Sequence, residues 1–141
     1  MKKVVLFIFL ALGIISFSAD YSKGAAAELK LVLISGNEYG FDITYYPEKD
    51  GTGKDEPLKA RESKTEIGIA VKKGNTYYYE GDSYGELCKI EITESAKKMT
   101  VKTNKNCSGY DNFDGTYQYK GKTSDKDTKD IKNNAEIFST Y

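Results

Sequence analysis

Alternation of apolar and polar side chains is the feature of this chain that most restricts its fold. Residues 39–46 read YGFDITYY, with an aromatic or aliphatic side chain at every second position. Successive side chains of a strand point to opposite faces, so a period of two predicts a strand that is buried on one face only. This pattern, or a short apolar run, is found in seven segments: 29–34, 39–46, 64–71, 76–80, 87–93, 99–103 and 116–120.

The seven segments predict an all-β domain of about seven antiparallel strands over residues 20–122. Short segments rich in turn residues separate most of them, and no helical pattern lies between them. A small barrel or sandwich is the architecture expected from such a series.

One hairpin of this domain allows a register to be predicted from its apolar side chains. Placing Ile92 opposite Met99 also places Ile90 opposite Val101 and puts Cys88 opposite Thr103. This register keeps the apolar residues of both strands on one face. We therefore expect residues 94–98 to form the loop between the two strands.

Residues 123–141 form a polar C-terminal tail with a weak helical pattern. Ile131, Ala135 and Phe138 follow Thr128, a candidate N-cap, at positions i, i+4 and i+7. Two consecutive asparagines within this stretch are poor helix formers. A short helix and a frayed tail are therefore both compatible with the sequence.

Residues 1–19 have the form of a secretory signal peptide. Lys2 and Lys3 precede an apolar run at residues 4–15, and small residues follow it. The run is shorter than the roughly 20 residues that cross a bilayer, so we expect a cleaved leader rather than a stable membrane anchor. Cleavage after Ser18 or Ala19 would deliver the protein to the periplasm or outside the cell.

The chain has two cysteines, Cys88 and Cys107. In an oxidising compartment such a pair usually forms a disulfide. A metal site and a redox pair are the alternatives, but two thiols without histidine do not complete a zinc site, and the spacing is not Cys-x-x-Cys. The sequence therefore favours a disulfide between the two cysteines.

Composition argues against several classes of function. The chain has no histidine, which removes the commonest general base and the commonest nitrogen ligand of metals. Its one arginine, Arg61, makes recognition of phosphate or guanine improbable, so nucleic acid is not expected as a partner. The glycine and lysine residues at 50–55 lack Walker spacing, and the acidic runs at 111–115 and 125–130 lack EF-hand spacing. We expect no catalytic residues, no cofactor and no metal site.

One part of the chain has an ordered series of short motifs: CKIEI at 88–92, MTVK at 99–102, CSG at 107–109 and DGTY at 114–117. The series resembles a terminal segment of small exported bacterial β-rich proteins of unknown function. The resemblance covers about a quarter of the chain, and it departs from the pattern where Ser108 separates the second cysteine from glycine. It implies a hairpin tied by a disulfide to the loop before the last strand, and it implies no activity.

Twelve tyrosines are the most unusual feature of the composition. Tyrosine is a good strand residue whose hydroxyl can stay in water, which accounts for many of them. Tyrosine also provides large, rigid contact area for a partner. The aromatic residues therefore lead to a hypothesis of binding rather than catalysis.

We expect a non-catalytic binding protein for a macromolecule, acting as an inhibitor or a surface-interaction factor. The predicted contacts are Tyr78, the long loop at residues 47–63, and a second loop with Tyr110, Asp111, Phe113 and Asp114. The alternative is a lipocalin-like carrier that holds a small apolar ligand inside a barrel.

Overall fold

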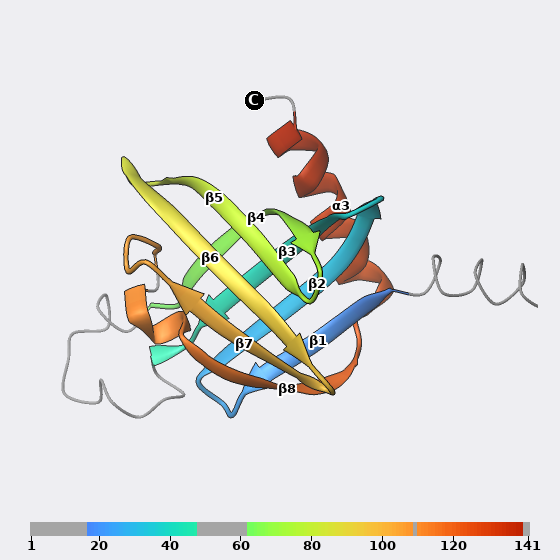
Figure 1. Ribbon diagram of the computed structural model, residues 1–141, viewed down its shortest axis with the longest axis horizontal. Coiled ribbons are helices and arrows are strands. Elements are labelled where there is room, and N and C mark those ends of the chain that lie inside the picture. Colours follow the sequence, from blue (N-terminus) through green and yellow to red (C-terminus); the bar gives the residue numbers. More distant parts are fainter. Residues whose placement is uncertain (1–16, 48–61, 109, 140–141) are drawn as a thin grey trace, which may run out of the picture.

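The computed structural model describes residues 17–47, 62–108 and 110–139, and it confirms the all-β fold class (Figure 1). Eight antiparallel strands pair in chain order and close into a barrel, because β1 pairs with both β2 and β8. A short 3-10 helix, η2 (Tyr110–Phe113), precedes the last strand, and one α-helix, α3 (Asp125–Ser139), follows it. The strands are β1 (Ser18–Lys23), β2 (Ala27–Ser35), β3 (Glu38–Tyr45), β4 (Lys64–Lys73), β5 (Thr76–Ser83), β6 (Glu86–Ser95), β7 (Lys98–Thr103) and β8 (Gly115–Lys122).

The eighth strand, which the sequence pattern did not reveal, is β1. It overlaps the end of the expected leader, and its inward face contributes only Ala19 and Tyr21 to the buried core. Tyr21 pairs with Leu29 on one side and with Tyr119 on the other, so this strand closes the barrel. Two inward-facing residues are too few to show a period of two. The apolar run of the expected leader, just before them, also obscures the pattern.

The barrel interior is packed with side chains. Tyr39 and Tyr77 meet edge to face with ring centroids 4.9 Å apart, and Phe41 and Tyr79 do so at 4.8 Å. An eight-stranded barrel is just wide enough for its own side chains to fill it. The largest fully buried side chains include Tyr77, Tyr117, Phe41, Phe113, Leu29, Leu31, Ile43, Ile90, Ile92 and Met99.

Glycines make room for one of these rings. A Cβ atom at Gly68 on β4 or at Gly81 on β5 would collide with the side chain of Tyr79. The Tyr79 ring therefore lies against bare backbone on two neighbouring strands. This packing is found where β4 and β5 have stopped pairing.

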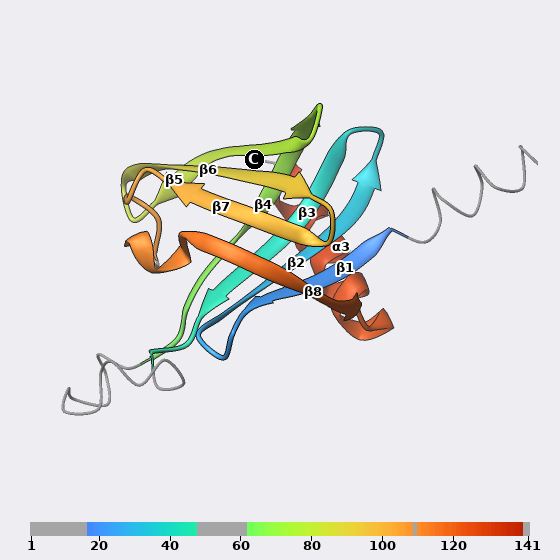
Figure 2. The same cartoon turned by 60° about the horizontal axis from the view of Figure 1, so that its bottom comes forward.

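The ladder between β4 and β5 is short. It consists of Val71 with Tyr78, Lys72 with Tyr77 and Lys73 with Thr76, all next to the turn. Beyond these pairs the two strands diverge, as Figure 2 shows. In this part of the barrel wall, packing of side chains such as Tyr79 therefore holds together two strands that backbone hydrogen bonds do not join.

The predicted register of the β6–β7 hairpin is wrong by two residues. Ile92 lies opposite Val101, and Glu94 lies opposite Met99. The connection is a two-residue turn, Ala96 and Lys97, in which Ala96 has a φ of 53°. Because the error is an even number of residues, every apolar side chain still faces the core.

The C-terminal tail forms the helix α3, so of the two alternatives the helix is confirmed. The Oγ atom of Ser124 accepts a hydrogen bond from the amide of Asp127 (3.2 Å), which makes Ser124 the N-cap and corrects the expected cap at Thr128. The helix packs on the outer face of β2, β3 and β4 through the buried residues Ile131 and Ala135 (Figure 1). Among the described residues, no helix combines the length and the apolar character that crossing a membrane requires.

Candidate functional site

The connections of an up-and-down barrel alternate between its two ends. Those that follow β1, β3, β5 and β7 therefore share one end, which we call the plugged end, and the turns after β2, β4 and β6 share the other (Figures 1 and 2). The expected loops at residues 47–63 and 110–114 begin and end at the plugged end. Residues 48–61 lie outside the described residues.

The segment between β7 and β8 closes the plugged end. Phe113 is fully buried in the core. The ammonium of Lys23 donates hydrogen bonds to the carbonyl oxygens of Asn112 (2.6 Å) and Asp114 (2.8 Å). The Asp114 carboxylate also accepts hydrogen bonds from the amide (2.9 Å) and hydroxyl (2.7 Å) of Thr103. Phe113 and Asp114, two of the predicted binding residues, are thus engaged with the barrel itself.

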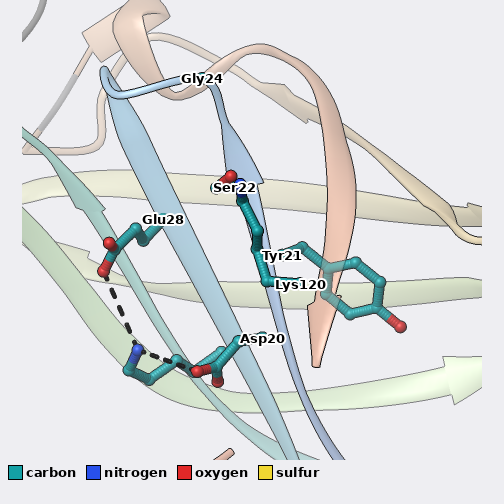
Figure 3. A pocket seen from close by; sticks show the side chains of 7 residues that line it. Asp20, Tyr21, Ser22, Gly24, Glu28 and Lys120 are labelled. Atoms are coloured by element: carbon teal, nitrogen blue, oxygen red, sulfur yellow. Dashed lines mark hydrogen bonds and ion pairs between the residues drawn. The ribbon is translucent and has the colours of Figure 1, made fainter. Parts of the chain in front are cut away.

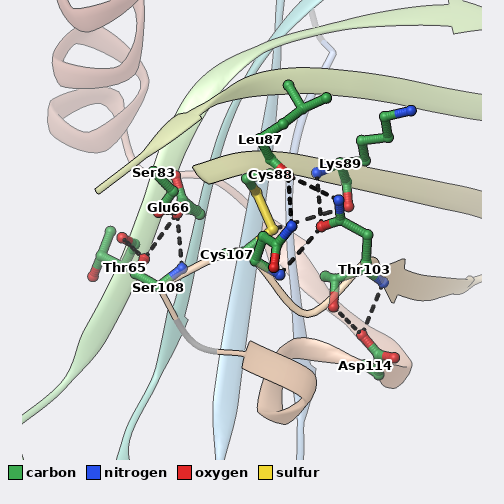
Figure 4. Close-up of a disulfide and its surroundings, with 12 residues drawn as sticks. Thr65, Glu66, Ser83, Leu87, Cys88, Lys89, Thr103, Cys107, Ser108 and Asp114 are labelled. Atoms are coloured by element: carbon green, nitrogen blue, oxygen red, sulfur yellow. Dashed lines mark hydrogen bonds between the residues drawn. A yellow bond between two sulfur atoms is a disulfide. The ribbon is translucent and has the colours of Figure 1, made fainter. Parts of the chain in front are cut away.

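A disulfide joins Cys88 to Cys107, as the sequence predicted (Figure 4). It holds the next residue, Ser108, against β4, where the Ser108 hydroxyl donates to the carbonyl oxygen of Thr65 (2.6 Å). The Ser108 amide donates to a carboxylate oxygen of Glu66 (2.9 Å). The disulfide therefore fixes the closing segment at the point where β4 and β5 have diverged.

Glu66 is the only charged side chain among the described residues that is buried, with 8% exposure. Its Oε1 atom also accepts a hydrogen bond from the Ser83 hydroxyl (2.6 Å), so it connects β4, β5 and the closing segment. Sequence reasoning missed this residue because Ile67 and Ile69 give β4 an apolar face that points outward, toward α3. A carboxylate covered in this way has a structural role.

The other predicted binding residues do not form a common surface. Tyr78 lies on the outer face of β5, 42% exposed, near the turn to β4 and far from the plugged end. Tyr110 and Asp111 belong to η2, and their side chains lie outside the described part of the structure. The structure therefore brings η2 and the ends of the 47–63 loop to one end of the barrel and places Tyr78 elsewhere.

Among the described residues, one exposed aromatic side chain at the plugged end was missed by sequence reasoning. Tyr84 is 93% exposed at the turn between β5 and β6. Its φ is 53° and that of Gly85 is 84°, and two successive positive values define a type I′ turn. Leu87, 49% exposed, follows on β6. We call residues 82–87 the β5–β6 tip.

The β5–β6 tip is stabilised by backbone pairing and is acidic. Ser83 and Glu86 pair directly across the turn, and the Asp82 carboxylate accepts a hydrogen bond from the Gly85 amide (3.3 Å). The side chains of Asp82 and Glu86 are both exposed beside Tyr84. The signal in the sequence was a tyrosine at a turn position that normally takes Asn, Asp or Gly.

A cavity of about 250 Å³ on the outer face of β1 and β2 contains charges that already satisfy one another (Figure 3). Lys30 lies 3.5 Å from a carboxylate oxygen of Asp20 and 3.9 Å from one of Glu28. Burial opposes the charge of Lys30, but these carboxylates and Asp127 outweigh it and raise the pKa of the lysine. The charges of Asp20, Glu28 and Lys30 in this cavity are therefore largely compensated within the protein.

Within the described residues, no group of three or more His, Cys, Asp or Glu side chains is placed to hold a metal ion. Comparisons with protein-family models, curated proteins and solved structures find no match to this chain. The geometry of its own residues is thus the basis for any functional conclusion.

Proposed function

We propose that this protein is an exported, non-catalytic binding protein that contacts a macromolecular partner with the β5–β6 tip. The observation that carries the proposal is the 93% exposure of Tyr84 in a left-handed backbone conformation. A residue with a Cβ atom costs about 1 to 2 kcal/mol in that region, and glycine or asparagine would form the same turn at lower cost. The tyrosine is therefore best explained by what its ring contacts outside the molecule.

The tip has the properties of an interface anchor. A two-residue turn between paired strands fixes the backbone of Tyr84, so little backbone entropy is left to lose on binding. Tyrosines are enriched among the residues that dominate binding energy, and Leu87 adds apolar area next to the ring.

The charges at the tip indicate the kind of partner. Asp82 and Glu86 flank Tyr84, and neither forms an ion pair with a described side chain. Complementary charge accelerates association and fixes orientation, so the partner has a basic rim around an apolar pocket. A projecting ring of this kind suits an inhibitor or a surface-interaction factor.

Two features support export. The first 19 residues read as a signal peptide, and the Cys88–Cys107 disulfide is the type of bond that forms in oxidising compartments. We do not propose a ligand inside the barrel, because Phe41, Tyr77 and Tyr79 fill its middle.

The test is differential capture from envelope extract and host secretions with the oxidised protein. Tyr84→Asn keeps a residue that tolerates the turn, and Tyr78→Thr is the matched control, an exposed tyrosine replaced by a good strand residue. A partner retained by the wild type and by Tyr78→Thr, but bound at least about tenfold more weakly by Tyr84→Asn, supports the proposal. Equal retention by all three proteins would contradict the proposal.

A further inference from the structure

A second surface, distant from the β5–β6 tip, has the shape and chemistry of a ligand site. A cavity of about 380 Å³ lies outside the barrel, between the end of β2 and the first turns of α3. It is at the barrel end opposite to the plugged end, since the β2–β3 turn forms part of it. We call it the β2–α3 groove.

The floor of the β2–α3 groove is apolar. Leu33 and Ile34 of β2 are partly exposed there, and Val32 lies buried beneath them. Phe17, which directly precedes β1, forms a further apolar wall. The floor thus offers the aliphatic side chains of β2 to an apolar group.

The rim of the groove is positively charged. Lys122 comes from the end of β8 and Lys132 from α3, and neither forms an ion pair with a described side chain. Asp125 is the one carboxylate among the residues around the groove. Asp125 and Thr128 belong to the first turn of α3, whose N-terminal end carries partial positive charge. The net field at the rim therefore favours an anion.

Removal of the leader changes one wall of the groove but keeps its floor and its two lysines. Cleavage after Ser18 would take away Phe17 and leave the α-amino group of Ala19, which is the strand neighbour of Lys122. The groove would lose part of one wall and gain a third positive charge. The floor formed by β2 and the two lysines would stay.

We propose that the β2–α3 groove binds a medium-chain fatty acid, with the acyl chain on the β2 floor and the carboxylate between Lys122 and Lys132. The volume, which includes the wall formed by Phe17, lies at the lower end of the range of about 300 to 1,000 Å³ that ligand sites occupy, and this fits a medium chain. An apolar floor with a cationic rim matches a molecule that is apolar along its length and anionic at one end. The site is separate from Tyr84 and does not depend on the function proposed above.

The test is calorimetric titration of the exported protein, recovered after leader removal, with dodecanoate below its micellar concentration. Decanoate, dodecanol and acetate are the comparison probes. We expect dodecanoate to bind, decanoate to bind up to about fifteenfold more weakly for its two missing methylenes, and acetate not to bind. Absence of dodecanoate binding, or dodecanol binding as tightly as dodecanoate, overturns the proposal.

Two further measurements locate the site. Lys132→Gln should weaken dodecanoate severalfold, whereas the matched control Lys129→Gln, on the same helix but outside the groove, should leave it unchanged. Amide chemical shifts should change most at Ile34 and Lys132. Equal effects of the two lysine variants, or shift changes centred on core residues such as Phe41, would contradict the assignment.

Discussion

The hydroxyl of Tyr117 donates a hydrogen bond of 2.7 Å to the carbonyl oxygen of Phe113. Both residues are fully buried, so this bond ties the closing segment to β8 from within the barrel. The hydroxyl of Tyr77 is also buried, yet it has no hydrogen-bond partner among the described residues. The two tyrosines thus differ in whether the hydroxyl has a hydrogen-bond partner among the described residues. Removing the hydroxyl oxygen from each residue tests this difference.

Replacing each tyrosine by phenylalanine should lower stability at position 117 but not at position 77. Tyr117→Phe leaves the Phe113 carbonyl without its donor and should lower the free energy of unfolding by about 1 to 3 kcal/mol. Tyr77→Phe removes an unpaired polar atom and should be neutral or stabilising by about 1 kcal/mol. Urea unfolding of the two variants gives both values. A loss of more than about 1 kcal/mol in Tyr77→Phe would show that its hydroxyl is paired after all.

Because the Tyr79 ring lies against Gly68, a larger side chain at position 68 should overpack the core. Gly68→Ala places a methyl group against the Tyr79 ring and should destabilise the protein by about 1 to 3 kcal/mol. Tyr79→Leu removes the obstructing ring, so the double variant should lose less stability than the sum of the two single variants. A double-mutant cycle measures this coupling, and strict additivity would count against the contact.

Loss of the disulfide should loosen the plugged end. Replacing Cys88 and Cys107 together by serine should cost about 3 kcal/mol, because the unfolded chain loses a closed loop. Ser108 and Glu66 should then separate more easily, which amide exchange at Ser108 would report. An unchanged exchange rate at Ser108 would mean that hydrogen bonds alone hold the segment.

Stability should fall at alkaline pH. Burial raises the pKa of Tyr21 to about 12, with smaller contributions from Glu94 and Tyr119, and burial also raises the pKa values of Tyr77 and Tyr117. In the unfolded chain these phenols ionise near pH 10, so the folded state binds more protons above that value. The stabilisation is complete below pH 10 and is lost as the pH rises from 10 through about 12.

Urea midpoints at pH 8, 10 and 11 measure the alkaline loss of stability. The absorbance difference at 295 nm between the wild type and Tyr21→Phe isolates the phenol of Tyr21. A Tyr21 titration near pH 10 in the folded protein would contradict the expected shift.

Most of the barrel was predictable because a period of two is a local property. The β6–β7 register was not, since Ile92 keeps the same face opposite either Met99 or Val101, and the two-residue turn decides between them. Which face of β4 points into the barrel was also not predictable, for a related reason. Ile67 and Ile69 face outward under α3, and a chain read alone does not distinguish a barrel interior from an outer face covered by a helix.

The candidate site was less accessible to sequence reasoning than the fold. Phe113 and Asp114 lie in a segment that looks like a surface loop, but their partners Tyr117 and Thr103 lie on strands whose arrangement only the closed barrel fixes. Tyr84 had a local signal, a bulky residue at a turn position that prefers Asn, Asp or Gly. Its exposure depends on where the turn between β5 and β6 lies in the folded barrel, and no local sequence pattern indicates this position.

The short pairing between β4 and β5 has a consequence for how this protein moves. Past Val71 and Tyr78, the wall depends on the Tyr79 ring and the Glu66 carboxylate rather than on a backbone ladder. Regions with fewer backbone hydrogen bonds open at lower free energy than the rest of a fold. We therefore expect local opening of the barrel to begin between β4 and β5, where water would reach the interior before the other strand pairs separate.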